Sequence, residues 1–167
     1  MCCNYVAPID SLVLGLKFGH QLRFAKPIAE FLEKSIHRNS TLLQGSTTLF
    51  CPVPLSRQRL STRGFNQSLE IARSITLPED SILLADLIWR LKDTIQQSSL
   101  HPDDRTQNVR GAFFINPALR NQIQGKHIAM IDDVITTGAT LNEIAKLVKQ
   151  AGAKSVTNFV FARTIWH

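Results

Sequence analysis

The chain has little of what defines a disulfide-bonded, zinc-binding or membrane-spanning protein. Its 3 cysteines, Cys2, Cys3 and Cys51, are an odd, low number typical of reduced thiols, here two of them at a flexible terminus. Adjacent Cys2 and Cys3 cannot supply the four ligands of a structural zinc ion, so we expect no structural zinc. Apolar runs fall short of the ~20 residues of a membrane span, and the first residues lack a secretory signal pattern. We therefore expect a cytoplasmic protein without a membrane span.

Familiar phosphate-binding glycine motifs are missing as well. The chain contains neither G-x-x-x-x-G-K-[ST] nor G-x-G-x-x-G. Hydrophobic residues make up 44% of the 167 residues, which excludes intrinsic disorder and predicts a single domain, residues 1–167, with a helical part at 1–45 and a core at 46–167. Lysine and arginine exceed the acids by 19 to 13, a net charge of +6 that permits a polyanionic partner.

Hydrophobic periodicity predicts alternating strands and helices. Two helices are expected within 8–38, separated at Gly19, with Phe24 and Phe31 facing the core. Residues 81–90 suit a strand or a buried helix equally, 55–64 reads as a basic loop, and 94–110 as a long polar connection. Strands are expected at 47–51, 112–115, 127–131 and 155–161, and helices at 64–75 and 140–151. The fold class is α/β, with a mostly parallel central sheet flanked by helices.

The strongest functional pattern follows the strand at 127–131. Asp132 and Asp133 come directly after it, and the loop Thr136-Thr137-Gly138-Ala139-Thr140 turns into a helix. A helix N-terminus attracts an anion such as phosphate, and Gly138 allows a close backbone approach. The two acids suit sugar hydroxyls or a hard cation such as Mg²⁺. Together these features predict a site for a ribose 5-phosphate.

A plainer interpretation treats the two aspartates as loop carboxylates and Thr140 as a helix N-cap. It would suit an isolated acid pair, but the strand, acids, threonines, glycine and helix here agree with one another. The ribose 5-phosphate interpretation would collapse if both acids were held in internal salt links while the threonine loop was sealed from solvent. Arg57, Arg59 and Arg63 either form a solvated face or contact the phosphates of pyrophosphate or nucleic acid.

The segment 132–140 resembles the phosphoribosyl pyrophosphate (PRPP) signature of type I phosphoribosyltransferases. Further matches resemble the competence protein ComF family, also called GntX: Pro52-Val53-Pro54-Leu55, Arg63-Gly64-Phe65-Asn66-Gln67, Leu16-Lys17-Phe18 and the middle segment around Gln97 and Arg105. The resemblance implies the type I phosphoribosyltransferase fold. That family's usual pattern begins with a cysteine-rich zinc-binding segment, of which this sequence keeps only Cys2 and Cys3.

The resemblance also implies a role for each matching position. Asp132 and Asp133 would hold the ribose hydroxyls and, indirectly, Mg²⁺, while residues 136–140 would hold the 5-phosphate. Val53, Pro54 and Leu55 would form the pyrophosphate loop; in the alternative interpretation, Pro52 and Pro54 only end a strand. A mobile loop within 94–110, including Thr94, Gln97 and Arg105, would close over the substrate.

Three functions remain open at this point. The chain is either a PRPP-binding, phosphoribosyltransferase-like protein of DNA uptake in natural transformation, a single-stranded DNA-binding accessory protein without transferase activity, or a nucleobase phosphoribosyltransferase of salvage. In the hypoxanthine-type enzymes that this loop resembles, the matching position is an aspartate that acts as general base. Thr136 cannot do so near neutral pH, so the resemblance argues against hypoxanthine or guanine as the acceptor. The family resemblance further implies a competence helicase as a partner, and Phe18, Arg23 and Lys26 suit single-stranded DNA.

Overall fold

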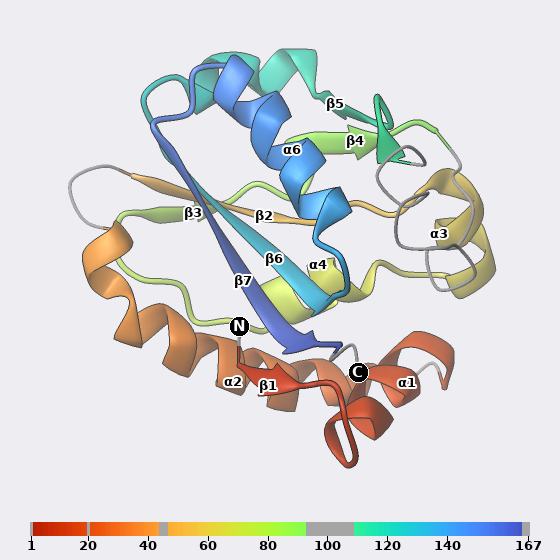
Figure 1. The fold of residues 1–167 in the computed structure, drawn as a ribbon. Helices are drawn as coiled ribbons and strands as arrows, with labels where there is room; N and C mark the ends of the chain where they lie inside the picture. Colours follow the sequence, from red (N-terminus) through yellow and green to blue (C-terminus); the bar gives the residue numbers. More distant parts are fainter. Residues whose placement is uncertain (1, 20, 44–46, 93–108, 165–167) are drawn as a thin grey trace.

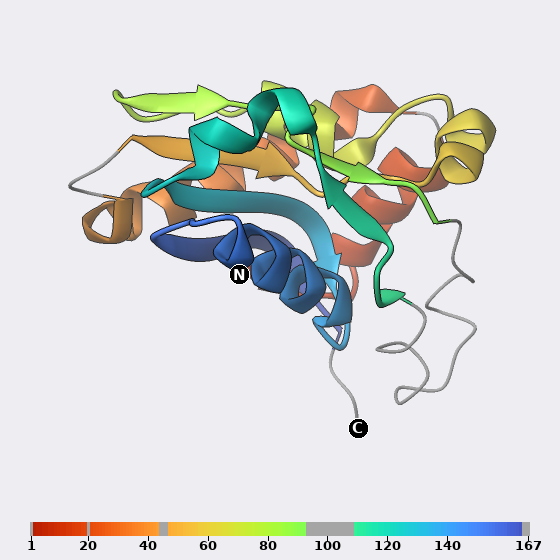
Figure 2. The same ribbon diagram turned by 90° about the horizontal axis from the view of Figure 1, so that it is seen from above.

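The computed structural model describes residues 2–19, 21–43, 47–92 and 109–164, which form three layers. A parallel sheet lies in the middle, with helix α6 (Ala139–Gln150) on one side and helix α2 (Ala25–Arg38) on the other (Figures 1 and 2). This arrangement confirms the predicted α/β class with a parallel sheet between helices.

The central sheet has five strands in the order β1-β7-β6-β2-β3, and every neighbouring pair is parallel. The strands are β1 (Cys3–Asn4), β2 (Thr48–Pro52), β3 (Ser81–Leu83), β6 (His127–Ile135) and β7 (Ser155–Arg163). β6 and β2 are central, so their side chains are covered on both faces, as their continuous apolar sequences predict. Parallel pairing brings the carboxyl ends of β2 and β6 together at one edge.

Alternate residues of the central strands supply two separate cores. Leu49, Met130 and Val160 pack beneath α6, where Ile144 and Val148 are fully buried. Phe50, Ala129 and Ile131 face the opposite way, toward α1 (Ile9–Phe18), α2 and α4 (Gln67–Arg73). The period-2 alternation of a strand therefore joins the two helical layers through a single sheet.

A small antiparallel sheet covers part of the α6 face. It pairs β4 (Ile88–Arg90) with β5 (Phe113–Ile115) and is followed by a 3₁₀ helix, η4 (Pro117–Ile123). Residues 81–90, for which strand and helix were equally suitable, are two short strands, β3 and β4, joined by a turn. The remaining 3₁₀ helices are η1 (Leu22–Phe24) and η2 (Ser40–Leu43).

Several local predictions are corrected by the structure. The expected basic loop at 55–64 contains helix α3 (Arg57–Arg63), which Ser56 caps by accepting a hydrogen bond from the Arg59 amide. β6 runs to Ile135, so the acid pair lies within the strand instead of after it. Cys2 and Cys3 are not in a flexible end, because the Cys2 amide donates to β7 carbonyls and Cys3 pairs with Ala162.

Two phenylalanines that the sequence places in the core bring one further correction. Phe24, the last residue of η1, is half-buried against the core, as expected, but Phe31 of α2 is 41% exposed, and its ring meets the Phe161 ring in an edge-to-face arrangement. Within the described ranges, the helices are too short or too polar to cross a membrane.

Candidate functional site

A cleft of about 830 Å³ lies at the carboxyl ends of β2 and β6. Most of its walls come from six parts of the chain: the end of α1, the turn after β2, helix α3, the start of helix α4, the end of β6, and the first turn of α6. The predicted site residues that line it are Val53, Pro54, Leu55, Arg59, Arg63, Asp132, Asp133, Thr136, Gly138, Ala139 and Thr140. Folding therefore brings together most of the residues that the sequence singled out, as expected at the carboxyl edge of an α/β sheet.

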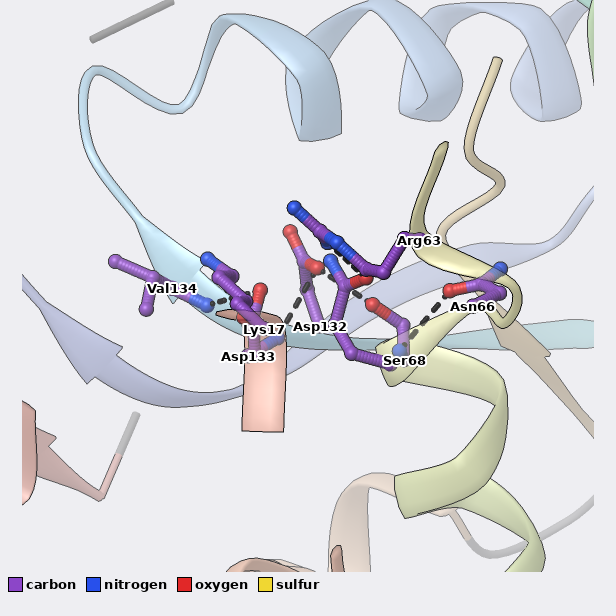
Figure 3. Close-up of polar contacts among 8 residues, drawn as sticks. Lys17, Arg63, Asn66, Ser68, Asp132, Asp133 and Val134 are labelled. Atoms are coloured by element: carbon purple, nitrogen blue, oxygen red, sulfur yellow. Dashed lines mark hydrogen bonds and ion pairs between the residues drawn. The ribbon is translucent and has the colours of Figure 1, made fainter. Parts of the chain in front are cut away.

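Asp132 is buried in one wall of this cleft, with 9% of its surface exposed. Its Oδ1 accepts hydrogen bonds from the Ser68 hydroxyl at 2.8 Å and from the Asp133 amide at 3.0 Å (Figure 3). Burial and the nearby Asp133 charge raise the pKa of Asp132 to about 7, while Lys17 and these hydrogen bonds act in the opposite direction. Near neutral pH this carboxyl group can therefore bind or release a proton.

Asp133 is more deeply buried, with 2% of its surface exposed. Its Oδ2 lies 2.6 Å from the Lys17 ammonium, and its Oδ1 accepts a hydrogen bond from the Val134 amide at 2.9 Å. Figure 3 shows Lys17 reaching the acid pair from the end of α1. One of the two acids is thus held in an internal salt link, while Asp132 is held by hydrogen bonds.

The predicted phosphate loop, residues 136–140, is open to solvent. Thr137 is exposed and Thr136, Gly138 and Thr140 are partly exposed, so the loop is not sealed. Gly138 has φ +80°, a backbone conformation that favours glycine, and it is the N-cap of α6 without any side-chain capping bond. The plainer alternative, in which Thr140 is the N-cap of this helix, is therefore wrong. The open first turn of α6 faces the cleft and suits an anion.

The turn at Val53, Pro54 and Leu55 is fixed in place beside the acids. The Val53 amide donates to the Ile131 carbonyl at 2.9 Å, and the Val53 carbonyl accepts from the Asn66 side-chain amide at 3.0 Å. The turn therefore extends the β2–β6 pairing by one bond and lines the cleft next to β6. Its predicted role in binding pyrophosphate stays a prediction.

The three arginines of the basic segment separate in the structure. Arg59 and Arg63 line the cleft, whereas Arg57 is exposed on α3 and is not part of its lining. The Arg63 guanidinium points toward the acid pair (Figure 3), lies 5.6 Å from the centre of the Phe18 ring and hydrogen-bonds Gln67. Burial lowers the pKa of Arg63, and the Asp133 charge opposes this shift.

Sequence reasoning missed two residues of the cleft and undervalued a third. Ser68 follows the Asn66-Gln67 pair, but no local pattern indicates that it bonds Asp132, which is 64 residues away. Arg90 ends β4, is only 6% exposed, and lies over the Phe113 ring. Lys17 belongs to the Leu16-Lys17-Phe18 match, but no sequence signal indicates that it pairs with Asp133. The proposed mobile-loop residues Thr94, Gln97 and Arg105 lie outside the described residues.

The fold and this site define a phosphoribosyl transferase domain: the model of the family described as "Phosphoribosyl transferase domain" matches residues 81–164, half of the chain. The chain belongs to the competence protein F family, which includes competence protein ComFC and DNA utilization protein YhgH. It is 31% identical to competence protein F of Haemophilus influenzae over 96% of this chain and 70% of that protein. It is 34% identical to YhgH of Salmonella typhimurium over 97% and 70%, respectively.

Two solved structures align with most of this chain at low sequence identity. A hypoxanthine phosphoribosyltransferase from Staphylococcus aureus aligns with a TM-score of 0.47 and 14% identity, covering 84% of this chain and 74% of that one. The glutamine PRPP amidotransferase of B. subtilis aligns with a TM-score of 0.44 and 17% identity, over 82% of this chain and 26% of that one.

Proposed function

We propose that the cleft binds PRPP or ribose 5-phosphate together with Mg²⁺, in a protein that serves the uptake or use of DNA. One observation carries the proposal: the open loop at the start of α6 and the acid pair of β6 line the same cleft. The names of the relatives, competence protein F and DNA utilization protein YhgH, support the link to DNA.

Different residues of the cleft would contact the 5-phosphate, the ribose and the pyrophosphate of such a ligand. Residues 136–140 would hold the 5-phosphate with backbone amides and threonine hydroxyls. Asp132 and Asp133 would accept hydrogen bonds from the ribose hydroxyls. The turn at 53–55 and the guanidinium groups of Arg59 and Arg63 would face the pyrophosphate, since guanidinium pairs well with phosphate oxygens.

The residues of the cleft fit a magnesium ion that arrives with the ligand. Magnesium prefers oxygen donors, keeps several waters, and is commonly held by one or two carboxylates plus substrate phosphates. Asp132 and Asp133 are the carboxylates in the described lining of the cleft, and their internal bonds favour contact through water. When bound, the ion would neutralise charge on a departing pyrophosphate.

If the cleft catalyses transfer, the bond that breaks joins ribose C1 to pyrophosphate. The chain's contribution would then be to orient the ribose and to stabilise the leaving group with Arg59 and Arg63. Thr136 would leave any acceptor without a general base at that position. Since none of the described residues that line the cleft would select a particular nucleobase, we do not favour a role in nucleobase salvage.

Thermal unfolding with and without PRPP plus Mg²⁺ tests the proposal. A ligand at 100 times its Kd stabilises a protein by ~2.7 kcal/mol, which would raise Tm by roughly 5–10 °C for a chain of this size. The double variant Asp132→Asn/Asp133→Asn should lose the shift. Glu79→Gln, which removes one exposed carboxylate away from the cleft, should keep it. The absence of a shift with either PRPP or ribose 5-phosphate would overturn the proposal.

A second candidate function is the binding of single-stranded DNA, with the cleft as a regulatory or relic site. Phe18 favours it: this large ring is 60% exposed at the cleft and carries the Arg63 guanidinium over its face. Exposed aromatic rings beside cations hold single strands by base stacking and phosphate contact. We include in this candidate the helicase that the family resemblance implies, because both proteins would hold the same strand.

Fluorescence anisotropy of a labelled oligonucleotide, titrated at several salt concentrations, tests this second candidate. The affinity should fall with salt by a log-log slope of about −0.7 per phosphate contact. Phe18→Ala and Arg63→Ala should weaken binding, and Arg120→Ala, on η4, should not. A salt-independent affinity would contradict it.

We also propose a cytoplasmic location, on the strength of three free cysteines, two of them adjacent.

A further inference from the structure

Lys17 occupies the position beside Asp133 where a cation would be expected to bind. Its ammonium lies 2.6 Å from Oδ2 of Asp133, and the lysine side chain is 21% exposed while the aspartate side chain is 3% exposed. No hydrogen bond to that oxygen is formed elsewhere among the described residues. The ammonium is therefore the charge that compensates this buried carboxylate.

Lys17 and Asp133 come from different parts of the fold. The lysine belongs to the last turn of α1, in the helical N-terminal part, whereas Asp133 lies in the central strand β6. Val13 and Leu16 are fully buried, which fixes α1 against the sheet. The lysine is thus held in place by packing, and it also lines the cleft that contains the phosphate loop.

We propose that Lys17 is the resident cation of the acid pair, which excludes a divalent metal ion from direct contact with Asp133 and leaves the pair to bind hydroxyl groups. Two neighbouring carboxylates without such a cation would attract a divalent ion strongly. The ammonium already neutralises the charge of the Asp133 carboxylate. A magnesium ion would then enter only with the pyrophosphate of a ligand such as PRPP.

Manganese alone, titrated into the full chain, tests this inference without any ribose ligand. The wild type should show no Mn²⁺ binding that depends on Asp133. Lys17→Met should gain such a site, with an affinity about tenfold or more above any residual Mn²⁺ binding of the wild type, because one adjacent positive charge has been removed. The gain should disappear in Lys17→Met/Asp133→Asn. Lys17→Arg, which keeps the charge, should behave like the wild type.

Lys146→Met is the matched control, because Lys146 is exposed on α6 and lies outside the cleft lining. It should leave Mn²⁺ binding unchanged, which separates a local effect from a general loss of positive charge. A purely structural role for Lys17 predicts a lower Tm but no gain of metal binding. If Lys17→Met binds Mn²⁺ no better than the wild type, the inference is wrong.

A measurement on the wild type covers the case in which Lys17→Met does not fold. Nitrogen-15 NMR of the lysine ammonium groups should show slow hydrogen exchange for Lys17, and this signal should persist when Mg²⁺ is added alone. Loss of the signal on addition of Mg²⁺ would overturn the inference.

A ligand measurement separates this inference from the proposed function, on which it partly rests. Ribose 5-phosphate lacks the pyrophosphate with which the ion would enter, so it should bind the wild type with nearly equal affinity in Mg²⁺ and in EDTA. Lys17→Met should bind it at least ~5-fold more tightly with Mg²⁺ than without. If ribose 5-phosphate fails to bind under every condition, the proposed function is wrong, while the Mn²⁺ titration still decides the role of Lys17. If it binds but Lys17→Met gains no metal dependence, the inference alone is wrong.

Discussion

The Ser68 hydroxyl donates a hydrogen bond of 2.8 Å to Oδ1 of Asp132, and this bond joins helix α4 to the central strand across 64 residues of sequence. Both residues are buried, Ser68 at 1% and Asp132 at 9% exposure. A hydrogen bond to a buried carboxylate compensates part of its lost hydration. The Ser68 hydroxyl therefore stabilises Asp132 in its buried position at the cleft.

Replacing Ser68 with alanine should lower the stability of the protein. The variant leaves Oδ1 of Asp132 with only the Asp133 amide as a donor, and the loss of one partner of a buried carboxylate costs about 2 kcal/mol. Urea unfolding followed by circular dichroism measures this loss. Ser74→Ala is the control, because the Ser74 hydroxyl makes a similar hydrogen bond, 2.9 Å to the Glu70 carbonyl, on the exposed side of α4. Equal losses in both variants would contradict the role assigned to Ser68.

The raised pKa of Asp132 predicts a pH dependence of stability. The folded protein holds a proton on this group up to a pKa of about 7, whereas in the unfolded chain the group ionises near its ordinary value of 3.8. Between these values the folded state binds more protons, so the free energy of unfolding should fall as pH rises, by at most ~1.4 kcal/mol per pH unit. Above pH 7 this contribution should be constant.

Urea unfolding of the wild type and Asp132→Asn between pH 4.5 and 8 checks this dependence. His127 has a lowered pKa because of its burial, which gives an opposite slope over part of the same window. That contribution is common to both proteins, so the difference between them isolates Asp132. The variant should gain stability relative to the wild type as pH rises toward 7. A difference that does not change with pH would show that the pKa of Asp132 is not raised.

The strand, loop and helix that carry the site were predictable from the sequence, because the patterns that indicate them are local. The strand β6, the loop 136–140 and the apolar stripe of α6 are adjacent in sequence, and each follows a hydrophobic period. The length of β6 was not predictable in this way. Its apolar run stops at Ile131, but pairing with β7 continues to Ile135. The neighbouring strand provides backbone hydrogen-bond partners for the two acids, although aspartate has a low intrinsic preference for strands.

Other parts of the site depend on tertiary packing or on a signal that was present but overlooked. Ser56 and Gly64 are a typical N-cap and C-terminal glycine for the helix α3, yet the polar sequence between them shows no apolar period. The contacts of Lys17 with Asp133 and of Ser68 with Asp132 join segments far apart in the chain. No pattern in a single sequence specifies such contacts.

Gly138→Ala should affect the proposed phosphate binding more than it affects stability. A side chain at this position has room, since the nearest atom to an added Cβ is Ile135 Cδ1 at 3.5 Å, but φ +80° is unfavourable for alanine by ~1 kcal/mol. Relief of this strain would turn the loop away from the cleft. We expect a loss of about 1 kcal/mol in stability and at least a ~10-fold loss of ribose 5-phosphate affinity, measured by calorimetry.

The control for this variant is Gly125→Ala, which has a similar φ of +70° and open space around it, at the start of β6 and far from the acid pair in the strand. It should lose a similar amount of stability and keep its affinity. If both variants keep their affinity, the loop 136–140 does not hold the phosphate.

Gly15→Ala should disturb the attachment of α1, the helix that carries Lys17. A Cβ at residue 15 would lie 2.4 Å from Cε2 of the Phe24 ring, so the ring or the helix has to shift. Such overpacking costs about 1–3 kcal/mol, which thermal unfolding would detect. Phe24→Leu removes the ring. In that background, Gly15→Ala should therefore lower the free energy of unfolding by less than it does in the wild type. If Gly15→Ala is as stable as the wild type, α1 and η1 are not in close contact at this point.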